Sequence, residues 1–577
     1  MNGAELLVGE LVRHGVRYIF GVPGDTSIAW YDAMRTQPLV KHVLATDERN
    51  AGFMADAFAR ITNEPGVCEG PSGAGFTYML PGICEANDNS IPLIALNTDI
   101  ETFFRGRARL TELDQVSIAA PMTRWSASLD DVRQIPFSVR KAFRIALGPR
   151  PGAVHLALPS NVMDSAADGV TASVVRGAPL RLPTTRQRPS DEELEAAARA
   201  IEGSRKPVLV VGGGVHLSRG YDALREFAEH IAAPVATSIS GKGAIAETHD
   251  LALGVVGENG GSEVASKAVA EADLVIFVGT HTGSVVTQKW TVPTQRKGQA
   301  IVQIDSNAEE VGRNYCLEVG LVGDARATLD ALRARLPKRR EMGERERQLR
   351  REVTEWRKQE SDMQGDGSPS CHPMSIVGLL RDVAPEDALY VADAGTPCPY
   401  LAAYLESRTG RHVLIPRGHG GLGWAIPAVV GAHYGLEHIG EAGRKIVAVM
   451  GDGSMRMSMN ELVTLVDNKI NAVIVLMQND EYGWCKTGEK AGGRSEHLGL
   501  DFPPRDYSAI AKAMGMAGES VSDTKSLGKA LRKAVKEDGP SFVSVATTPM
   551  WKGQPPIIGW RKKLQAGRQS PAAGSCS

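Results

Sequence analysis

The chain has 577 residues, more than one hydrophobic core usually organises, so we expect about two to four domains. Hydrophobic residues make up 42% and charged residues 23%, which is typical of a globular protein and excludes large-scale disorder. The formal net charge of −2 provides no field that would attract nucleic acid or an anionic membrane surface, so we expect neither as a partner.

The N-terminal stretch MNGAELLVGELVRHGV carries Glu5 and Glu10 among its apolar residues and does not have the pattern of a signal peptide. No apolar run reaches the length needed to span a membrane. The seven cysteines form no C-x-x-C pair, which argues against a disulfide framework or a zinc site. We therefore expect a protein of the reducing cytoplasm.

The first segment, residues 1–165, alternates short apolar runs with stretches of helical periodicity such as 50–60, a pattern typical of parallel α/β layers. The strand-like runs are Tyr18–Val22, His42–Ala45, Leu93–Asn97 and Ala153–Leu158. A Pro- and Arg-rich linker, APLRLPTTRQRPSDEEL, follows. At its end, Ser190 with Glu193 three residues later predicts a capped helix start.

The second segment, residues 190–335, repeats the alternation with the runs PVLVVGGGV, ADLVIFVG and AIVQID. The next run, PKRREMGERERQLRREVTEWRKQE, is dominated by charged residues. Because charges of both signs are mixed, a solvated connecting helix within residues 336–371 fits this run better than a nucleic-acid-binding arm.

The third segment, residues 372–550, alternates again, and residues 551–577 are rich in Pro, Gly, Lys and Ser and are expected to form a tail. Its strand-like runs are ALYVADAG, HVLIP, KIVAVMGDG, AVIVLMQND and SFVSVAT. Together the segments predict an α/β protein with three doubly wound parallel-sheet domains.

Two polar residues follow successive strands of the third segment. Asp452 lies in GDGS, and Asn479 lies 27 positions later in ND. Ligands of open α/β sheets collect at the carboxyl ends of strands. A carboxylate and an amide oxygen there, with a main-chain carbonyl and phosphate oxygens, suit Mg²⁺. Gly453 would allow a diphosphate to approach the main chain, and Ser454 adds a hydroxyl. The alternative is a simple β-turn followed by a capped loop.

The pair GDGS and ND resembles the motif of thiamine-diphosphate (ThDP) enzymes, in which Asp, Asn and a carbonyl two residues beyond the Asn hold Mg²⁺ on the diphosphate. The resemblance implies ThDP and Mg²⁺ as cofactors and assigns that carbonyl to Glu481.

Further stretches are similar to the same family. GHGGLGWAIPAVVGA resembles the segment whose bulky apolar residue bends the cofactor, which implies Leu422 as that wedge, with the Gly420 carbonyl and the Leu422 N–H facing the aminopyrimidine. VADAGTPCPY is similar to the segment that closes over the diphosphate, through Gly395 and Thr396.

The first segment completes the resemblance. GVPGD and TDERNAGFMADAFAR look like the pyrimidine-binding domain of acetolactate synthases and 2-oxoacid decarboxylases, and residues 206–325 are similar to their central domain. The implied order is pyrimidine-binding, central and diphosphate-binding domain, over residues 1–550. The family assigns to Glu48 the hydrogen bond to the pyrimidine that activates the cofactor, a carboxylate otherwise readable as a surface residue at a helix start.

In the family, the glutamate and the Mg²⁺ site of each active site come from two different chains. The resemblance therefore implies a homo-oligomer, a dimer or a tetramer, with active sites at the subunit interface.

Three residues bear on the reaction. Asp25 matches the catalytic aspartate of pyruvate-decarboxylase-like members by position, or is a turn residue. His419 is an acid–base candidate, or a histidine satisfied by neighbouring backbone. Thr111 stands where acetolactate synthases usually carry a glutamine, a departure from the family pattern.

The favoured function is carboligation of a 2-oxo acid or a related carbonyl substrate, as in acetolactate synthases. The runner-up is simple decarboxylation, because GGLGWAIPA looks more like benzoylformate decarboxylase. The sequence also leaves open a ThDP lyase acting on CoA thioesters and a non-catalytic ThDP-binding protein. Intact Glu48, Asp452 and Asn479 argue against a non-catalytic role.

FAD is a second cofactor of several synthases. GGGV offers a glycine turn that could approach a dinucleotide phosphate, which alone is a weak signal. VGTHTGSVV lacks the arginine that flavin-binding members usually place there, so the sequence argues against FAD.

Overall fold

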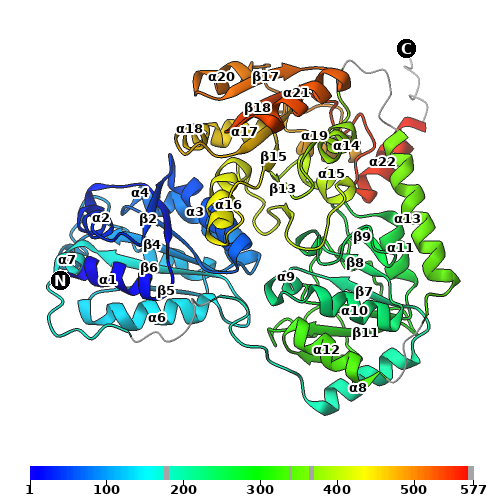
Figure 1. The fold of residues 1–577 in the computed structure, drawn as a ribbon, viewed down its shortest axis with the longest axis horizontal. Coiled ribbons are helices and arrows are strands. Elements are labelled where there is room, and N and C mark those ends of the chain that lie inside the picture. Colours follow the sequence, from blue (N-terminus) through cyan, green and yellow to red (C-terminus); the bar gives the residue numbers. More distant parts are fainter. Residues whose placement is uncertain (174–180, 337–340, 363–369, 570–577) are drawn as a thin grey trace. The chain divides into compact units, whose positions relative to one another are not determined.

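The computed structural model of the protein describes residues 1–173, 181–336, 341–362 and 370–569 (Figure 1). It divides into two compact units. The first unit contains residues 1–184, 416–446 and 458–471, and the second contains 185–415, 447–457 and 472–577. They hold three six-stranded parallel sheets, which confirms the α/β fold predicted from the sequence.

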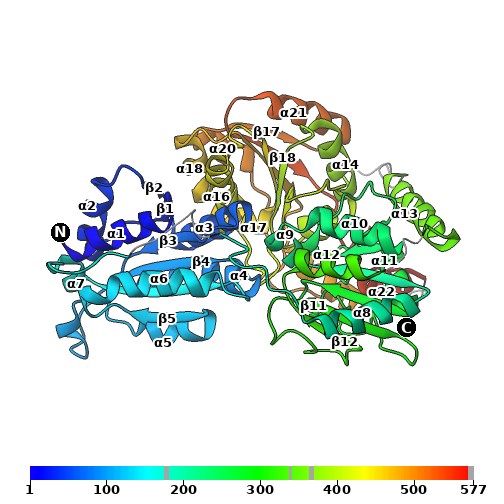
Figure 2. The same ribbon diagram turned by 60° about the horizontal axis from the view of Figure 1, so that its bottom comes forward.

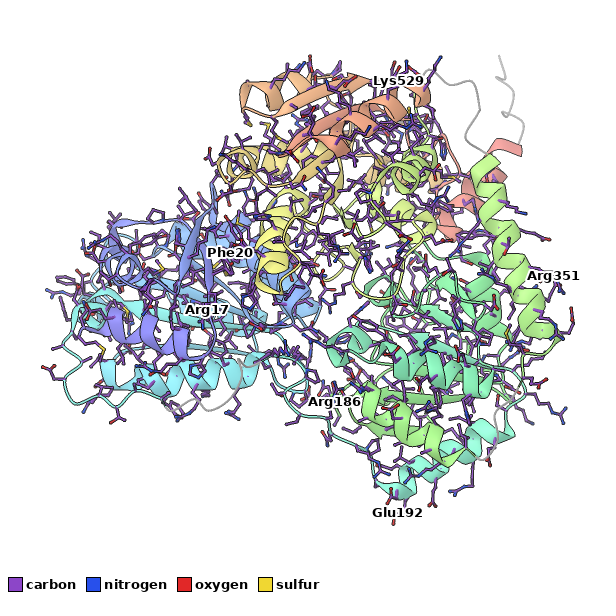
Figure 3. The ribbon with its side chains drawn as sticks, in the orientation of Figure 1. Arg17, Phe20, Arg186, Glu192, Arg351 and Lys529 are labelled. Carbon is purple, nitrogen blue, oxygen red and sulfur yellow. The ribbon has the colours of Figure 1, made fainter. Side chains whose placement is uncertain are left out.

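The first unit is built on a sheet of strand order β2-β1-β3-β4-β6-β5, in which every neighbouring pair is parallel. Phe20 of β1 is fully buried in its core (Figure 3). The strands are β1 (Tyr18–Gly21), β2 (Lys41–Leu44), β3 (Gly66–Gly70), β4 (Leu93–Asp99), β5 (Trp125–Ser128) and β6 (Ala153–Pro159). All four predicted strand runs of this segment are confirmed.

Two layers of helices cover this sheet (Figure 2). In one layer α1 (Gly3–Arg13) contacts α2 (Ile28–Arg35) and α6 (Ile135–Ala146). In the other, α3 (Glu48–Thr62) contacts both α4 (Ala74–Asp88) and α16 (Ala425–His438). The helices α3 and α16 approach closely, since a Cβ at Gly431 would lie only 2.0 Å from the carbonyl oxygen of Met54.

The second unit contains two sheets. The order of one is β12-β11-β10-β7-β8-β9, all parallel. Its strands are β7 (Pro207–Val211), β8 (Val235–Thr237), β9 (Ala252–Val255), β10 (Leu274–Val278), β11 (Ala300–Asp305) and β12 (Val319–Val322). Helix α8 (Asp191–Gly203) enters this region with the predicted capping box of Ser190 and Glu193. The charged run forms α13 (Glu344–Asp362), from which Leu349 and Val353 are buried against the sheet.

The other sheet of the second unit has the order β14-β13-β15-β16-β18-β17. Its strands are β13 (Leu389–Ala392), β14 (Val413–Leu414), β15 (Ile446–Gly451), β16 (Ala472–Gln478), β17 (Ala517–Val521) and β18 (Ser541–Ala546). Helices α15 (Pro397–Tyr404), α17 (Asp452–Ser458) and α19 (Gly483–Ala491) follow β13, β15 and β16. Three loops therefore leave this sheet at the carboxyl ends of its strands, where a ligand is expected.

Residues 416–446 group with the first unit by their contacts, because α16 packs along α3. The expected tail contains α22 (Ile558–Gln569), in which Trp560 packs against Trp484 with tilted rings and Arg561 donates to Glu263. Residues 570–577 of that tail, and 337–340 and 363–369 of the charged linker, lie outside the described residues. Within the described ranges no helix is both long and apolar enough to cross a membrane.

Candidate active site

The two strand ends singled out in the sequence meet in the second unit. Asp452 directly follows β15, and one of its carboxylate oxygens accepts hydrogen bonds from the main-chain N–H groups of Asn479 (2.9 Å) and Asp480. Its other oxygen accepts from the N–H of Gly453 at 2.9 Å. Asp452 therefore ties the loop after β15 to the loop after β16.

The electrostatics of Asp452 suit a cation. The side chain is buried, and burial raises the pKa of its carboxyl to about 6, although the hydrogen bonds from Asp480 and Asn479 oppose this shift. The negative charge of Asp480 raises this pKa further. A cation bound beside Asp452 would favour its ionised form.

A small cradle surrounds Asn479. A Cβ at Gly483 would lie 2.8 Å from the Asn479 amide nitrogen and 3.2 Å from the Thr396 hydroxyl, so only glycine leaves this space open. The main-chain carbonyl of Glu481 accepts a hydrogen bond from the N–H of Gly483. The side-chain oxygen Oε1 of Glu481 is buried without a hydrogen-bond partner among the described residues. Carboxylate, amide, carbonyl and hydroxyl oxygens converge here, a donor set that fits Mg²⁺ on a diphosphate.

The loops after β13 and β15 contribute the remaining predicted residues of this region. Gly395 has φ +95°, a backbone conformation that favours glycine, and Thr396 begins α15. The hydroxyl of Ser454 donates to the carbonyl of Ala394 at 3.5 Å. A Cβ at Gly453 would lie 2.8 Å from the ring of Tyr482. The predicted diphosphate-binding residues therefore come from three loops that touch one another.

The first unit holds the predicted pyrimidine-side carboxylate. Glu48 is the first residue of α3, whose N-cap Asp47 accepts from the N–H of Arg49. Glu48 is half-buried, and burial, with a smaller effect from Asp47, raises the pKa of its carboxyl. A Cβ at Gly75 would lie 3.1 Å from Oε1 of Glu48, which places this carboxylate at the first turn of α4.

A buried polar cluster next to Glu48 was missed by sequence reasoning. Glu69 of β3 is buried and accepts hydrogen bonds from the Tyr31 hydroxyl and, at 3.3 Å, from Nε2 of His42. Burial and the charge of Glu69 raise the pKa of Tyr31 above its ordinary range. A charged residue inside the short run GVCEG is the signal that could have revealed this cluster.

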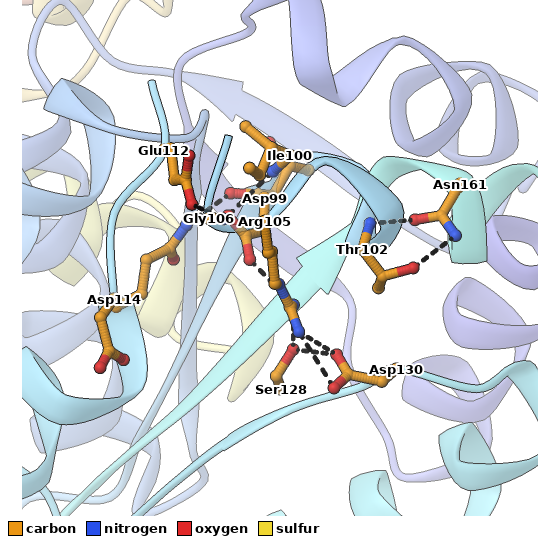
Figure 4. A network of polar contacts seen from close by, with 12 residues as sticks. Asp99, Ile100, Thr102, Arg105, Gly106, Glu112, Asp114, Ser128, Asp130 and Asn161 are labelled. Atoms are coloured by element: carbon orange, nitrogen blue, oxygen red, sulfur yellow. Dashed lines mark hydrogen bonds and ion pairs between the residues drawn. The ribbon is translucent and has the colours of Figure 1, made fainter. Parts of the chain in front are cut away.

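The loop after β4 carries Thr111 in an uncommon conformation. Its φ is +69°, which is strained for a β-branched residue, and its hydroxyl lies 2.7 Å from that of Ser72. Arg105 pins the start of this loop by donating to Asp99 (3.1 Å), Ser128 (2.8 Å) and Asp130 (Figure 4). Asp25 lies in the turn after β1 and is exposed.

The loop before α16 carries the last three candidates. His419 and Gly420 are exposed, and Leu422 is half-buried. The N–H groups of residues 418–420 all donate to the carboxylate of Glu85 in α4, a contact that sequence reasoning also missed. No local sequence pattern predicts that the Glu85 side chain binds main-chain groups 333 positions away.

The glycine turn of the central sheet has a structural role. A Cβ at Gly212 would lie 2.3 Å from the carbonyl oxygen of Gly279, and one at Gly214 would lie 2.7 Å from the Gly279 Cα. Close packing of two strand-end loops therefore requires glycine at these two positions.

Three family profiles match the chain. They are the thiamine pyrophosphate enzyme N-terminal TPP binding domain over residues 1–118, the central domain over 194–332 and the C-terminal TPP binding domain over 393–545. A probable acetolactate synthase large subunit of Methanocaldococcus jannaschii is 30% identical, over 95% of this chain and 92% of that protein. The acetolactate synthase large subunits of Pyropia yezoensis (28%, over 100% and 97%) and Lactococcus lactis (27%, over 94% and 92%) are also similar.

Proposed function

Since the chain belongs to the thiamine pyrophosphate enzyme family, we propose that it binds ThDP through Mg²⁺ and catalyses acetolactate-synthase-like carboligation of a 2-oxo acid. The observation that carries this proposal is the meeting of three strand-end loops around Asp452, with Asn479 and Thr396 lining the cradle left by Gly483.

Each residue has a task in this proposal. Asp452, the Asn479 amide and the Glu481 carbonyl hold the metal, while Thr396 and Ser454 donate to the diphosphate. When bound, ThDP would supply a nucleophilic carbon and an electron sink for the decarboxylation of a 2-oxo acid. Glu48, with its raised pKa, holds a proton at the pyrimidine nitrogen.

The first unit alone supports a site assembled from two chains. The Glu48 carboxylate lies next to Gly75, in the first turn of α4. The N–H of Gly420 is bound by Glu85, near the other end of the same helix. Ten residues of helix separate these points, or about 15 Å. Glu48 and Gly420 of one chain are therefore too far apart to contact one aminopyrimidine ring, so we propose that a partner chain supplies the second contact.

Several exposed apolar side chains belong to the same edge of the first sheet as Glu48. They follow the carboxyl ends of strands β1 to β4, the edge at which Glu48 lies. Such a gathering marks an interaction surface, and a second copy of this chain is the proposed occupant. The side chains are Ile28 (66% exposed), Leu44 (59%), Tyr78 (58%) and Leu110 (77%).

The choice of reaction rests on the similar synthases, whose coverage extends over nearly the whole chain. Simple decarboxylation is the second candidate, because Thr111 stands where the synthases usually carry a glutamine and has an uncommon backbone conformation, with φ +69°. In the decarboxylation, the carboxylate leaves as CO₂ and the acyl unit takes up a proton. In the carboligation, the acyl unit instead bonds to the carbonyl carbon of a second substrate molecule.

Product analysis tests the proposal. Purified protein with Mg²⁺ and ThDP would receive a panel of 2-oxo acids, with CO₂ and organic products measured. A 2-hydroxy-3-oxo acid formed with CO₂ is the expected result, and an aldehyde alone would favour the second candidate. A protein that binds ThDP yet converts no 2-oxo acid would contradict both. An absorption spectrum without flavin bands is expected in the same preparation.

A further inference from the structure

A buried carboxylate in the first unit binds three consecutive main-chain groups. Glu85 of α4 accepts from the N–H groups of Gly418 at 3.1 Å, His419 at 2.8 Å and Gly420 at 3.1 Å, and its side chain is 1% exposed. A carboxylate that accepts several backbone N–H groups forms strong, charge-assisted hydrogen bonds. Glu85 therefore fixes the start of the loop 418–424.

A second buried carboxylate holds the other end of this loop. Asp56 of α3 accepts from the indole N–H of Trp424 at 2.9 Å, and both side chains are fully buried. Arg60 bridges the two carboxylates, with its Nε 2.9 Å from Asp56 and its Nη2 3.3 Å from Glu85. Its guanidinium also lies 5.3 Å from the centre of the Trp424 ring.

Burying three charged side chains costs folding free energy, so such a cluster is an unfavourable way to stabilise a fold. Two carboxylates share one arginine, and burial together with Glu85 raises the pKa of Asp56 to about 6, although Arg60 opposes the shift. Well-packed apolar residues would often give equal or greater stability. What the charged cluster adds is a single loop conformation.

The part of the loop between the two anchors is presented outward. Gly420 is exposed, has φ +76°, and a Cβ there would meet nothing within 4 Å. Leu422 is half-buried. A surface segment held at both ends and open in the middle has the form of a preorganised binding element.

We propose that Asp56, Arg60 and Glu85 are positioning residues, which form a clamp that aims the Gly420 carbonyl at the 4′-amino group of the aminopyrimidine. This inference rests on the proposed function, because it takes ThDP as the ligand. The clamp touches the loop and not the cofactor, so its loss changes recognition of one group of the cofactor rather than its chemistry.

Binding of two cofactor forms tests the clamp. Calorimetric titration with Mg²⁺ would compare ThDP with its 4′-deamino analogue, in wild type, Glu85→Gln and Trp424→Phe. Wild type is expected to prefer ThDP, and both variants are expected to lose roughly fivefold of that preference, the value of about one hydrogen bond. Trp424→Phe removes the donor to Asp56 and keeps a buried aromatic ring of smaller size, so it carries the test should Glu85→Gln fail to fold.

Glu10→Gln is the matched control. Glu10 is another fully buried carboxylate of the first unit that accepts a backbone N–H, from Ser173 at 2.8 Å, and it does not contact the loop. This variant is expected to change thermal stability and leave the preference for ThDP unaltered. An unchanged preference in the clamp variants, or equal binding of both ligands by wild type, overturns the clamp. Binding of neither ligand by wild type contradicts the proposed function instead.

Discussion

Replacing Asp452 by Asn is expected to stabilise the ligand-free protein at neutral pH and to abolish its stabilisation by Mg²⁺ and ThDP. Three N–H groups point at the carboxylate, from Gly453, Asn479 and Asp480. Asparagine has the shape of the protonated acid, with one acceptor oxygen and an NH₂ group that carries two donors. The variant therefore has the charge of wild type at low pH, but it loses the hydrogen bond from whichever N–H faces the NH₂ group.

The magnitude follows from the pKa of Asp452, which burial raises from 3.8 to about 6. Below about pH 4 the carboxyl is neutral in both folded and unfolded chains, and between pH 4 and 6 it ionises only in the unfolded chain. The free energy of unfolding therefore falls as pH rises through this window, by about 3 kcal/mol in total, since each pH unit contributes about 1.4 kcal/mol.

Denaturation of wild type and Asp452→Asn at pH 4 to 8 measures this difference, because all remaining titrating groups are common to the two proteins. The difference in unfolding free energy between the variant and wild type should shift in favour of the variant by up to about 3 kcal/mol between pH 4 and pH 6. Adding Mg²⁺ and ThDP at pH 8 should stabilise wild type alone, by about 2.7 kcal/mol at a hundredfold excess over Kd. Parallel stability profiles for the two proteins would refute the reasoning.

Three further substitutions have defined outcomes. Glu48→Gln should retain binding of Mg²⁺ and ThDP but slow turnover roughly 10²- to 10⁴-fold, because it removes only the proton-holding charge, and near-normal kcat would count against this role. Leu110→Glu should shift the light-scattering mass toward the 61.7 kDa chain and abolish activity, whereas Leu39→Glu, at the opposite end of β2, should do neither. Thr111→Gly should be more stable than Thr111→Ala by about 1 kcal/mol, the reverse of the usual order, because φ is +69° at this position. Thermal denaturation of the two variants measures this difference. Equal stability of the two variants would exclude backbone strain at Thr111.

Local sequence signals predicted much of the fold. Apolar runs marked the strands, and Ser190 with Glu193 marked a helix start, because both are properties of neighbouring residues. The pairing of Asp452 with the Asn479 loop was also predictable, since carboxyl ends of parallel strands meet at one edge of a sheet.

Contacts between distant segments could not be read from the sequence. Glu85 looks like any polar residue of a helix until α4 places it against residues 418–420. Residues 416–446 continue the third segment in sequence, yet α16 packs along α3 of the first unit. The expected tail contains Ile557, which is buried, and Trp560, which packs against Trp484. Apolar contacts such as these leave no periodic pattern in the sequence.

Activity of mixed inactive variants tests the central claim, that one chain supplies Glu48 and its partner supplies Asp452. Glu48→Gln and Asp452→Ala would each be inactive alone, and would be unfolded and refolded together. If every site takes one residue from each chain, hybrid dimers contain one intact site, and about a quarter of wild-type activity should return. No recovery in a mixture shown to contain hybrid dimers would mean that both residues act within one chain, and the account would be wrong.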